Sequence, residues 1–330
     1  LTTRYRHNGF DLTKAPLMHV TLARLGPGQA RLIWAVHHIV SDGWSTRCVL
    51  DAILARYNGT EVPKGAQFRD YLGWLKARDG AGGRAFWQRY LSGVSAPTRI
   101  ETRGAPDGQV HQHAQRMVPA TIADRIEAQA RSLRITQSTL LSTVWALVLR
   151  RYARSDDIVF GATNAGRPAD LPGADRAAGA FLNTLPVRVQ FDPQATVAAT
   201  LRTAEAEIRT RRAFEATALA DVQAWSDLPA GTPVFDYVFA YERLPDPAET
   251  AGPLRLGHLE TVQSSNYPLT CLATPGDGLR LEIYFDAGLF SASAIATMLE
   301  DFERLQPAVL DHPQAPIADL GNALPALQAP

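Results

Sequence analysis

The stretch His37-His38-Ile39-Val40-Ser41-Asp42-Gly43-Trp44-Ser45 decides the fold, because a predicted strand runs into it and a predicted helix leaves it. Before it, apolar residues alternate with other residues over 18–23 and again over 32–36, and Gly26-Pro27-Gly28 separates the two runs. Such alternation around a glycine-containing turn predicts a β-hairpin. After Gly43 the apolar spacing becomes helical as far as Asn58-Gly59, and we expect Ser45 to cap the start of that helix.

The two histidines end the second predicted strand and are the candidate functional side chains. Neighbouring strand residues point to opposite faces, so His38 is expected to share the face of Trp34 while His37 faces the other way. An imidazole accepts a proton near neutral pH, which makes a histidine here a candidate general base. Asp42 can orient an imidazole or pair with an arginine, and Gly43 permits positive φ or the close approach of a ligand.

Two other interpretations of the histidines stay open at this point. Paired histidines at a strand end are commonly packed and hydrogen-bonded residues without a catalytic role. A zinc site is not indicated, because the sequence has no HExxH motif and no cysteine cluster, and adjacent strand histidines diverge.

The rest of the chain predicts a mixture of helices and strands. Helices are expected at 68–78, 84–91, 121–133, 137–152, 197–212 and around 295–305, and strands at 158–163, 182–191, 234–241, 269–273 and 279–285. This mixture predicts an α+β fold or a two-lobed α/β sandwich. Residues 95–109 are rich in glycine and proline, and we expect them to link the later part of an N-terminal lobe (1–94) to a C-terminal lobe (110–330).

Composition excludes several classes of partner. The 330 residues contain 33 basic and 33 acidic side chains, so the formal net charge is zero and no nucleic-acid or anionic-membrane partner is indicated. Two cysteines cannot form a disulfide framework, and no apolar run is long enough to span a bilayer. We therefore expect a cytoplasmic protein. The sequence begins without Met and is expected to be an excerpt.

Four further stretches follow the histidine stretch along the chain. They are FRDYLGW (68–74), DIVFG with a later GRP (157–161 and 166–168), GAFLNTLPVR (179–188) and SSNYPL (264–269). In this order, and together with the HHxxxDG pattern of 37–43, they resemble the motifs of the condensation domains of nonribosomal peptide synthetases. The resemblance covers nearly the whole chain.

The resemblance implies a chloramphenicol-acetyltransferase-like fold, with two lobes in a V, a central tunnel and an incomplete first lobe. It implies an acyltransferase that joins a donor acyl or peptidyl thioester to the amine of an acceptor aminoacyl thioester. Both substrates would arrive on the 4'-phosphopantetheine of donor and acceptor peptidyl carrier proteins, next to other synthetase domains. We expect no cofactor or metal to be bound by the domain itself.

The resemblance also implies roles for individual residues. Within the catalytic motif His38 would be the active-site histidine, His37 and Asp42 structural, and Gly43 part of the reaction centre. The residues expected to line the substrate tunnel are Trp44, Asn183, Thr184, Ser264 and Asn266. Tyr71 and Trp74 are expected to be packing aromatics.

Two departures from the family pattern lead to expectations of their own. Two upstream motifs are absent, and one of them supplies the arginine that pairs with the motif aspartate, so Asp42 is expected to lack that partner. Residues 214–223 match the family's HQDxPFE motif poorly, which bears on the subtype of the domain.

Three related classes are alternatives. An epimerization domain shares the histidine motif but tends to continue as DGVSWR, and it lacks the Asn-Thr-Leu-Pro pattern of 183–186. A heterocyclization domain would have DxxxxDxxS in place of the two histidines. A noncatalytic, condensation-like docking module usually has a damaged histidine motif, whereas the motif of this chain is intact.

Overall fold

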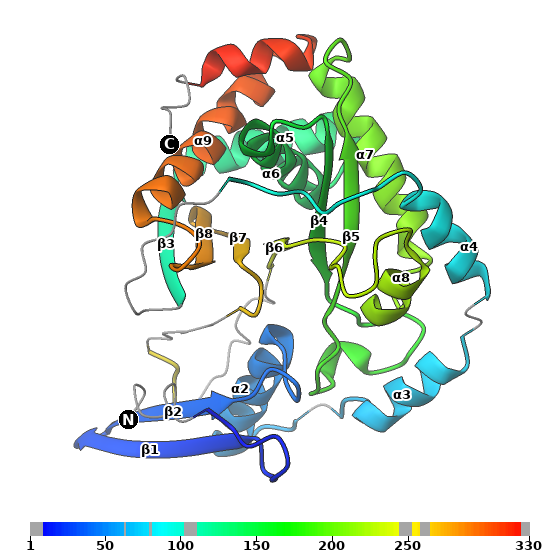
Figure 1. Ribbon diagram of the computed structural model, residues 1–330. Helices are drawn as coiled ribbons and strands as arrows, with labels where there is room; N and C mark the ends of the chain where they lie inside the picture. Colours follow the sequence, from blue (N-terminus) through cyan, green and yellow to red (C-terminus); the bar gives the residue numbers. More distant parts are fainter. Residues whose placement is uncertain are drawn as a thin grey trace. The chain divides into compact units, whose positions relative to one another are not determined.

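Figure 1 shows the computed structural model, which describes residues 9–62, 64–78, 81–101, 111–243, 253–257 and 265–324. The contacts divide the chain into two compact units. Unit 1 comprises Leu1–Arg78, Ala165–Leu182 and Leu244–Leu259, and unit 2 comprises Asp79–Asn164, Asn183–Arg243 and Glu260–Pro330. Each unit is therefore assembled from three separate stretches of chain.

A two-stranded hairpin opens unit 1 and confirms the hairpin prediction. Strand β1 (Met18–Gly26) pairs antiparallel with β2 (Gln29–Val36), and the chain reverses at Gly28, whose φ is +69°. Figure 1 shows the two strands side by side. The left-handed backbone of the turn suits glycine because a Cβ would be strained there.

Helices complete the described part of unit 1. They are α2 (Gly43–Tyr57), α3 (Phe68–Lys76) and the short 3-10 helix η1 (Ala174–Arg176), which comes from the second stretch of the unit. Helix α2 ends at Tyr57 with Asn58 as its C-cap, as the Asn-Gly pair predicts, and Gly59 follows with a φ of +74°.

Unit 2 is built on a six-stranded mixed sheet in the order β3-β8-β7-β6-β4-β5. The strands are β3 (His111–Val118), β4 (Asp157–Asn164), β5 (Asn183–Gln190), β6 (Tyr237–Tyr241), β7 (Leu269–Gly276) and β8 (Gly278–Asp286). Strand β6 pairs parallel with both β4 and β7, and the other pairs are antiparallel. The antiparallel β7–β8 hairpin agrees with the two strands expected at 269–273 and 279–285.

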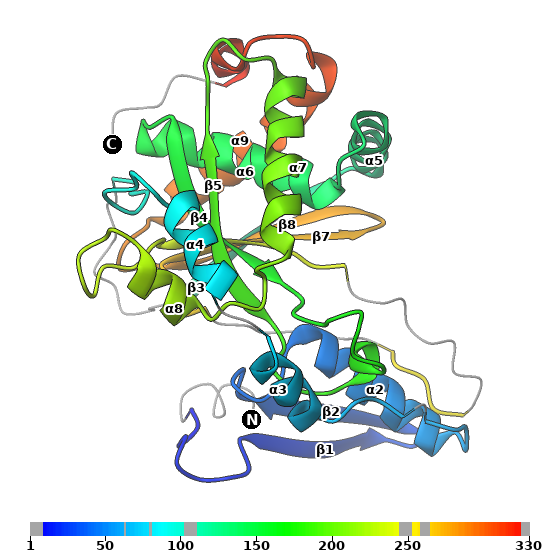
Figure 2. The same cartoon turned by 90° about the vertical axis from the view of Figure 1, so that its right-hand side faces the viewer.

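Helices pack on both faces of this sheet. They are α4 (Ala81–Tyr90), α5 (Ala120–Leu133), α6 (Gln137–Ala153), α7 (Val197–Arg212), α8 (Leu219–Trp225), α9 (Ala292–Asp311) and the 3-10 helix η2 (Ile317–Ala323). Alternate residues of β4 show the two faces: Ile158 and Phe160 join the core with α6 and α9, whereas Val159 joins a second core with α4 and α8. Figure 2 shows α4 and α8 close to each other.

The packing around residues 94–100 differs from the linker that we expected over 95–109. Residues 102–110 lie outside the described residues, but the part before them is fixed to the sheet of unit 2. The Val159 amide donates a hydrogen bond to Thr98 Oγ1 (2.7 Å), and the Ile100 amide donates one to Tyr237 Oη (2.9 Å). Helix α4, which we placed in the N-terminal lobe, buries Trp87 completely in unit 2.

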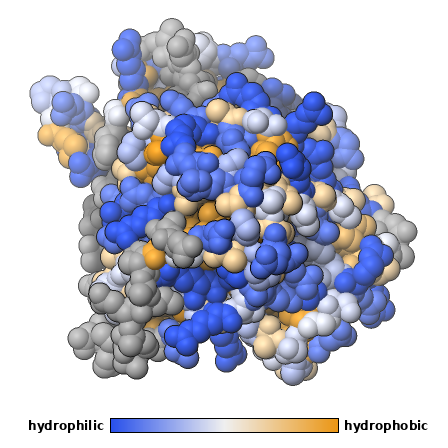
Figure 3. Space-filling model, turned by 90° about the horizontal axis from the view of Figure 1, so that it is seen from above, coloured by the Kyte–Doolittle hydropathy of each residue, from blue (hydrophilic) through white to orange (hydrophobic). Residues whose placement is uncertain are grey.

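One strand and one α-helix were missed by the sequence analysis. Strand β3 consists mostly of polar residues because it is an edge strand whose side chains are largely solvent-exposed. Helix α8 is only seven residues long, and a single residue in it, Val222, is buried. Outward-facing polar residues also dominate the face shown in Figure 3, where hydrophobic residues are scattered.

Candidate active site

The two histidines lie in a tight turn and not in the strand, which corrects the parity expectation. Strand β2 ends at Val36, and the His37 amide still donates to the Leu17 carbonyl (3.0 Å). The Val40 amide then donates back to the His37 carbonyl (3.1 Å), which closes a turn with His38 and Ile39 at its corners. The different surroundings of the two imidazoles therefore result from the geometry of the turn and not from the alternation of side chains along a strand.

His37 is held by its surroundings, whereas His38 is exposed. The His37 Nδ1 atom accepts a hydrogen bond from the Ile39 amide (3.1 Å), and the ring of Phe10 meets the His37 ring edge-on at 6.0 Å. The side chain of His38 faces solvent next to Ile39, whose exposed fraction is 58%. Of the two, His38 is the imidazole that a substrate can reach from this turn.

Asp42 is a buried anchor with three partners. Its Oδ1 atom accepts from the Ser45 amide (2.7 Å) and from Arg167 Nη2 (3.1 Å), and its Oδ2 atom accepts from the Phe181 amide (3.1 Å). Asp42 is therefore the N-cap of α2, the position that we assigned to Ser45. A carboxylate that is 4% exposed and fully bonded holds the chain in place and is not free to act as a base.

Arg167 supplies the partner that Asp42 was expected to lack. Its Nη2 atom also donates to Ser45 Oγ (2.8 Å), and its Nη1 atom donates to the carbonyls of Ala174 (2.6 Å) and Ala177 (2.7 Å). The guanidinium group lies 4.2 Å from the centre of the Phe181 ring. The expectation was wrong because the arginine comes from the GRP stretch, 125 residues after Asp42.

Further contacts attach the start of α2 to the 165–182 stretch of unit 1. Ser45 Oγ donates to the Gly179 carbonyl (2.7 Å) and accepts from the Gly179 amide (3.0 Å). The Trp44 indole Nε1 donates to the Asp175 carbonyl (2.7 Å), so this side chain has a structural partner within unit 1. Gly43 is the first residue of α2 and does not have the positive φ that we considered for it.

An aromatic cluster supports this region. Tyr71 on α3 is buried against Phe181 at 4.6 Å between ring centres, and it stacks on Trp74 at 5.9 Å. The Trp74 indole Nε1 also donates to Asp170 (3.1 Å). The packing role predicted for Tyr71 and Trp74 is confirmed.

The other predicted tunnel residues belong to unit 2. The side-chain nitrogen Nδ2 of Asn183 donates to the backbone carbonyls of Glu215 (2.9 Å) and Thr217 (2.8 Å) and thereby holds the loop before α8. Burial raises the pKa of Tyr267, and its hydrogen bond with Thr184 opposes that rise. Asn266 is exposed, and Ser264 lies outside the described residues.

An ion pair between two of the quoted motifs was not foreseen. Arg188 Nε and Nη2 donate to the two carboxylate oxygens of Asp157, at 2.9 and 2.6 Å. Both residues belong to the quoted stretches, DIVFG and GAFLNTLPVR, and these stretches form the adjacent strands β4 and β5. The sequence alone does not show that these two strands pair antiparallel, and this pairing brings Asp157 and Arg188 together.

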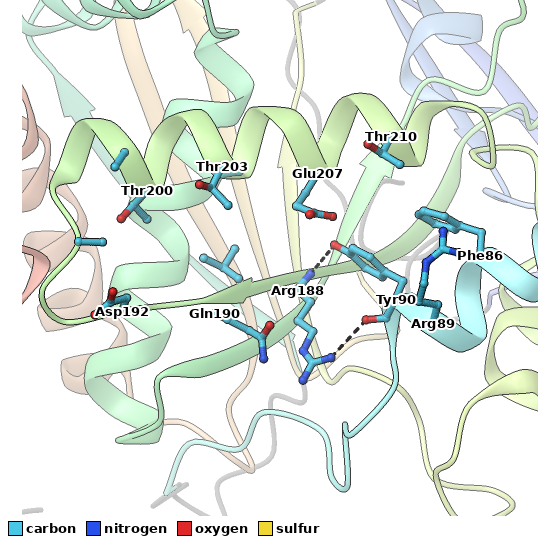
Figure 4. A pocket seen from close by; sticks show the side chains of 14 residues that line it. Phe86, Arg89, Tyr90, Arg188, Gln190, Asp192, Thr200, Thr203, Glu207 and Thr210 are labelled. Carbon is cyan, nitrogen blue, oxygen red and sulfur yellow. Dashed lines mark hydrogen bonds between the residues drawn. The ribbon is translucent and has the colours of Figure 1, made fainter.

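A cavity of about 610 Å³ lies in unit 2 and is lined by α4, β5 and α7 (Figure 4). There the Arg188 amide donates to Tyr90 Oη (2.9 Å), and Glu207 and Arg89 carry opposite charges on the lining. No histidine lines it, so it lacks the side chain best suited to accept a proton near neutral pH. The histidine turn of unit 1 is therefore the candidate active site.

The part of the chain that the structure describes offers neither a metal site nor a membrane-spanning helix. In it, no three or more His, Cys, Asp or Glu side chains are grouped so that they could hold a metal ion. Within the same residues, no helix has the length and apolar character needed to cross a membrane.

Comparisons with known proteins identify the family of the chain. The family model described as "Condensation domain" matches residues 1–328, and the chain belongs to this family. It is 35% identical over 327 residues to a linear gramicidin synthase protein of Brevibacillus parabrevis, covering 96% of this chain and 6% of that protein. It is 36% identical over 284 residues to chondramide synthase cmdD of Chondromyces crocatus, covering 83% of this chain and 7% of that protein.

Solved structures share the fold, which confirms the predicted fold class. A four-domain nonribosomal peptide synthetase bound to AMP and glycine superposes with a TM-score of 0.83 at 19% identity, covering 99% of this chain and 27% of that one. The X-domain from teicoplanin biosynthesis superposes with a TM-score of 0.81 at 21% identity, covering 96% and 78%. Condensation domains are acyltransferases, and peptide-bond formation between carrier-bound substrates is the function of the family.

Proposed function

We propose that this domain forms an amide bond between a donor acyl or peptidyl thioester and an acceptor aminoacyl thioester, and that His38 is its catalytic residue. One observation supports this proposal above the others: His38 is an exposed imidazole at the corner of a turn whose two flanks are fixed by His37 and Asp42. A catalytic side chain must be accessible to the substrate, and the backbone that carries it must be held rigidly.

In the proposed reaction the acceptor amine attacks the carbonyl carbon of the donor thioester. A C–N bond forms, the C–S bond breaks, and the donor phosphopantetheine leaves as a thiol. His38 accepts the proton that the amine nitrogen loses, and that proton is available to the departing sulfur. Asp42, which is paired with Arg167, holds the turn throughout.

We further propose donor and acceptor peptidyl carrier proteins as partners, within a multidomain cytoplasmic synthetase. The support is the similarity to synthases that are much longer than this chain. The substrates would be presented on phosphopantetheine arms, and the domain itself would bind no cofactor. Trp44, Asn183 and Thr184 keep a proposed substrate-facing role in addition to the structural contacts described above.

The test is His38→Ala in the synthetase that carries the domain, with product on the acceptor carrier followed by intact-protein mass spectrometry. Amide formation should fall by about 10²–10⁴-fold, the usual contribution of a positioned general base, while loading of both carriers persists. His312→Ala, at an exposed histidine that follows α9, is the matched control and should leave the rate unchanged. A loss of less than about tenfold for His38→Ala would show that His38 does not act as the base.

A further inference from the structure

Strand β5 lies at one edge of the six-stranded sheet of unit 2, and its hydrogen-bonded neighbour is β4. In an antiparallel ladder the backbone groups of alternate residues point toward the neighbouring strand and away from it. The Arg188 amide donates to Tyr90 Oη and therefore points away from β4, and so do the backbone groups of Pro186 and Gln190. An edge strand whose outward groups are free is a template for pairing with another chain.

Side chains occupy the outward backbone groups at 186 and 188. Proline has no N–H, and the Pro186 carbonyl accepts a hydrogen bond from Arg211 Nη1 (2.9 Å). The Arg188 amide donates to Tyr90 Oη (2.9 Å), as a dashed line in Figure 4 shows. Tyr90 is itself held in place, because Arg188 Nη1 donates to the carbonyls of Tyr90 (3.3 Å) and Ser92 (2.8 Å). An incoming strand therefore finds no free donor at either residue and no free acceptor at Pro186.

The contact between Arg211 and Pro186 is not an ordinary ion pair. Arg211 is 3% exposed, and desolvation lowers the pKa of its guanidinium group. Among the residues that the structure describes, its Nε atom has no hydrogen-bond partner and no carboxylate forms an ion pair with it. Desolvating a cation costs more than one neutral carbonyl offsets, so stability does not explain this placement. Covering the Pro186 carbonyl does explain it.

The covered groups are the ones that two copies of β5 would use to pair with each other. Identical strands pair antiparallel about a two-fold axis. In the register centred on Val187, Pro186 of each copy lies opposite Arg188 of the other. Each Arg188 amide would then donate to the Pro186 carbonyl of the other copy, and these are the donor and the acceptor that side chains occupy here.

We infer that Tyr90, Pro186 and Arg211 form an edge cap that prevents β5 from pairing with β5 of a second copy of this domain. Proline removes one donor, the tyrosine hydroxyl occupies the next donor, and the guanidinium group occupies the acceptor between them. The edge cap goes beyond the proposed function, because it concerns the association of the domain with itself and not the reaction at His38.

The experiment opens the edge cap with Tyr90→Phe/Arg211→Met, which removes both hydrogen-bonding side chains and keeps their apolar parts. After circular dichroism has shown that the 330-residue variant is folded, sedimentation velocity over a range of concentrations measures its self-association. Two hydrogen bonds become possible between two copies, and each corresponds to about two- to tenfold in an equilibrium constant. The association constant should therefore rise at least about fourfold above that of the wild type.

The matched control is Tyr57→Phe/Arg212→Met, which makes the same changes of composition and charge at two exposed positions. It should associate as the wild type does. An association constant of Tyr90→Phe/Arg211→Met within about twofold of this control would overturn the inference.

Hydrogen exchange of single amides tests the edge cap independently of association. In the wild type the Arg188 amide should exchange at least about tenfold more slowly than the exposed Gln190 amide, and Tyr90→Phe in dilute solution should remove this difference. Equal exchange of the two amides in the wild type would overturn the inference, and this comparison stands even if the double variant does not fold. In the associated double variant both amides should become protected as the concentration rises. Protection that rises elsewhere in the chain and not in β5 would show a different interface and would also overturn the inference.

Discussion

Replacing Arg167 with Met removes the group that joins the histidine turn to the 165–182 stretch. Met has a similar length and no donors, so the change deletes the hydrogen bonds to Asp42, to Ser45 and to two backbone carbonyls with little change in packing volume. The side chains of Arg167 and Asp42 are 6% and 3% exposed, so solvent cannot replace what is lost. The Asp42 carboxylate is left buried without its cation.

Breaking a buried ion pair by removing one partner costs about 3–5 kcal/mol. Asp42 keeps two amide donors, from Ser45 and Phe181, which favours the lower end of that range. We therefore expect Arg167→Met to lower the free energy of unfolding by about 3 kcal/mol in urea titrations followed by circular dichroism. Arg167→Lys keeps the charge but not the forked geometry, so its loss should be smaller and not zero.

A double-mutant cycle tests the assignment of this cost to the pair. In Asp42→Asn the buried group is neutral, so the second change, Arg167→Met, should cost much less than it does in the wild type. Unfolding free energies that add to within about 0.5 kcal/mol would show that the two residues do not interact, and the reasoning would fail. A total loss below about 1 kcal/mol for Arg167→Met would place the pair among ordinary surface ion pairs.

Two further predictions concern backbone space and acid stability. Gly166 has a φ of +62°, and a Cβ there would lie 1.7 Å from the Phe181 carbonyl oxygen, so Gly166→Ala should lose more than about 4 kcal/mol in urea titrations. Gly28→Ala, with a similar φ and open space around it, is the control and should lose only about 1–2 kcal/mol. Burial opposes ionisation of Glu205, but hydrogen bonds from Thr139 and Arg209 outweigh it and hold the pKa of Glu205 below 4.5. A lowered pKa in the folded state adds stability above pH 4.5, and this stability is lost as the pH falls below that value. The loss of unfolding free energy caused by Glu205→Gln in urea titrations should therefore become smaller in acid. A loss that becomes larger in acid would contradict the lowered pKa of Glu205.

The fold was predictable where periodicity is strong. The alternation before His37 and the helical spacing of 197–212 predict elements that agree with β1, β2 and α7 to within a few residues. Strand β3 was not predictable in this way, because its outward positions and several inward ones are polar. The lobe boundary was misplaced for another reason: glycine and proline mark a break in regular structure, not the unit against which the flanking residues pack.

The candidate site was predictable in its residues and not in its contacts. The sequence places His37, His38 and Asp42 together because they are neighbours in the chain. It does not show that Arg167 contacts Asp42, since tertiary pairing over 125 residues leaves no local pattern. A signal for this arginine is nevertheless present in the sequence, because Arg167 belongs to the GRP stretch, which is one of the quoted motifs.

The joining of unit 1 from distant stretches sets an order of events during synthesis on the ribosome. Asp42 cannot accept the hydrogen bond from the Phe181 amide until a further 139 residues have been synthesised. Its partner Arg167 is synthesised only shortly before Phe181. Translation adds about 5–20 residues per second, so roughly 7–28 s pass between the synthesis of Asp42 and that of Phe181. During this time the Asp42 carboxylate is still hydrated. The nascent site therefore matures late, after the hairpin and α2 have emerged, and a translational pause between residues 42 and 181 would lengthen the interval in which this segment is open to chaperones and proteases.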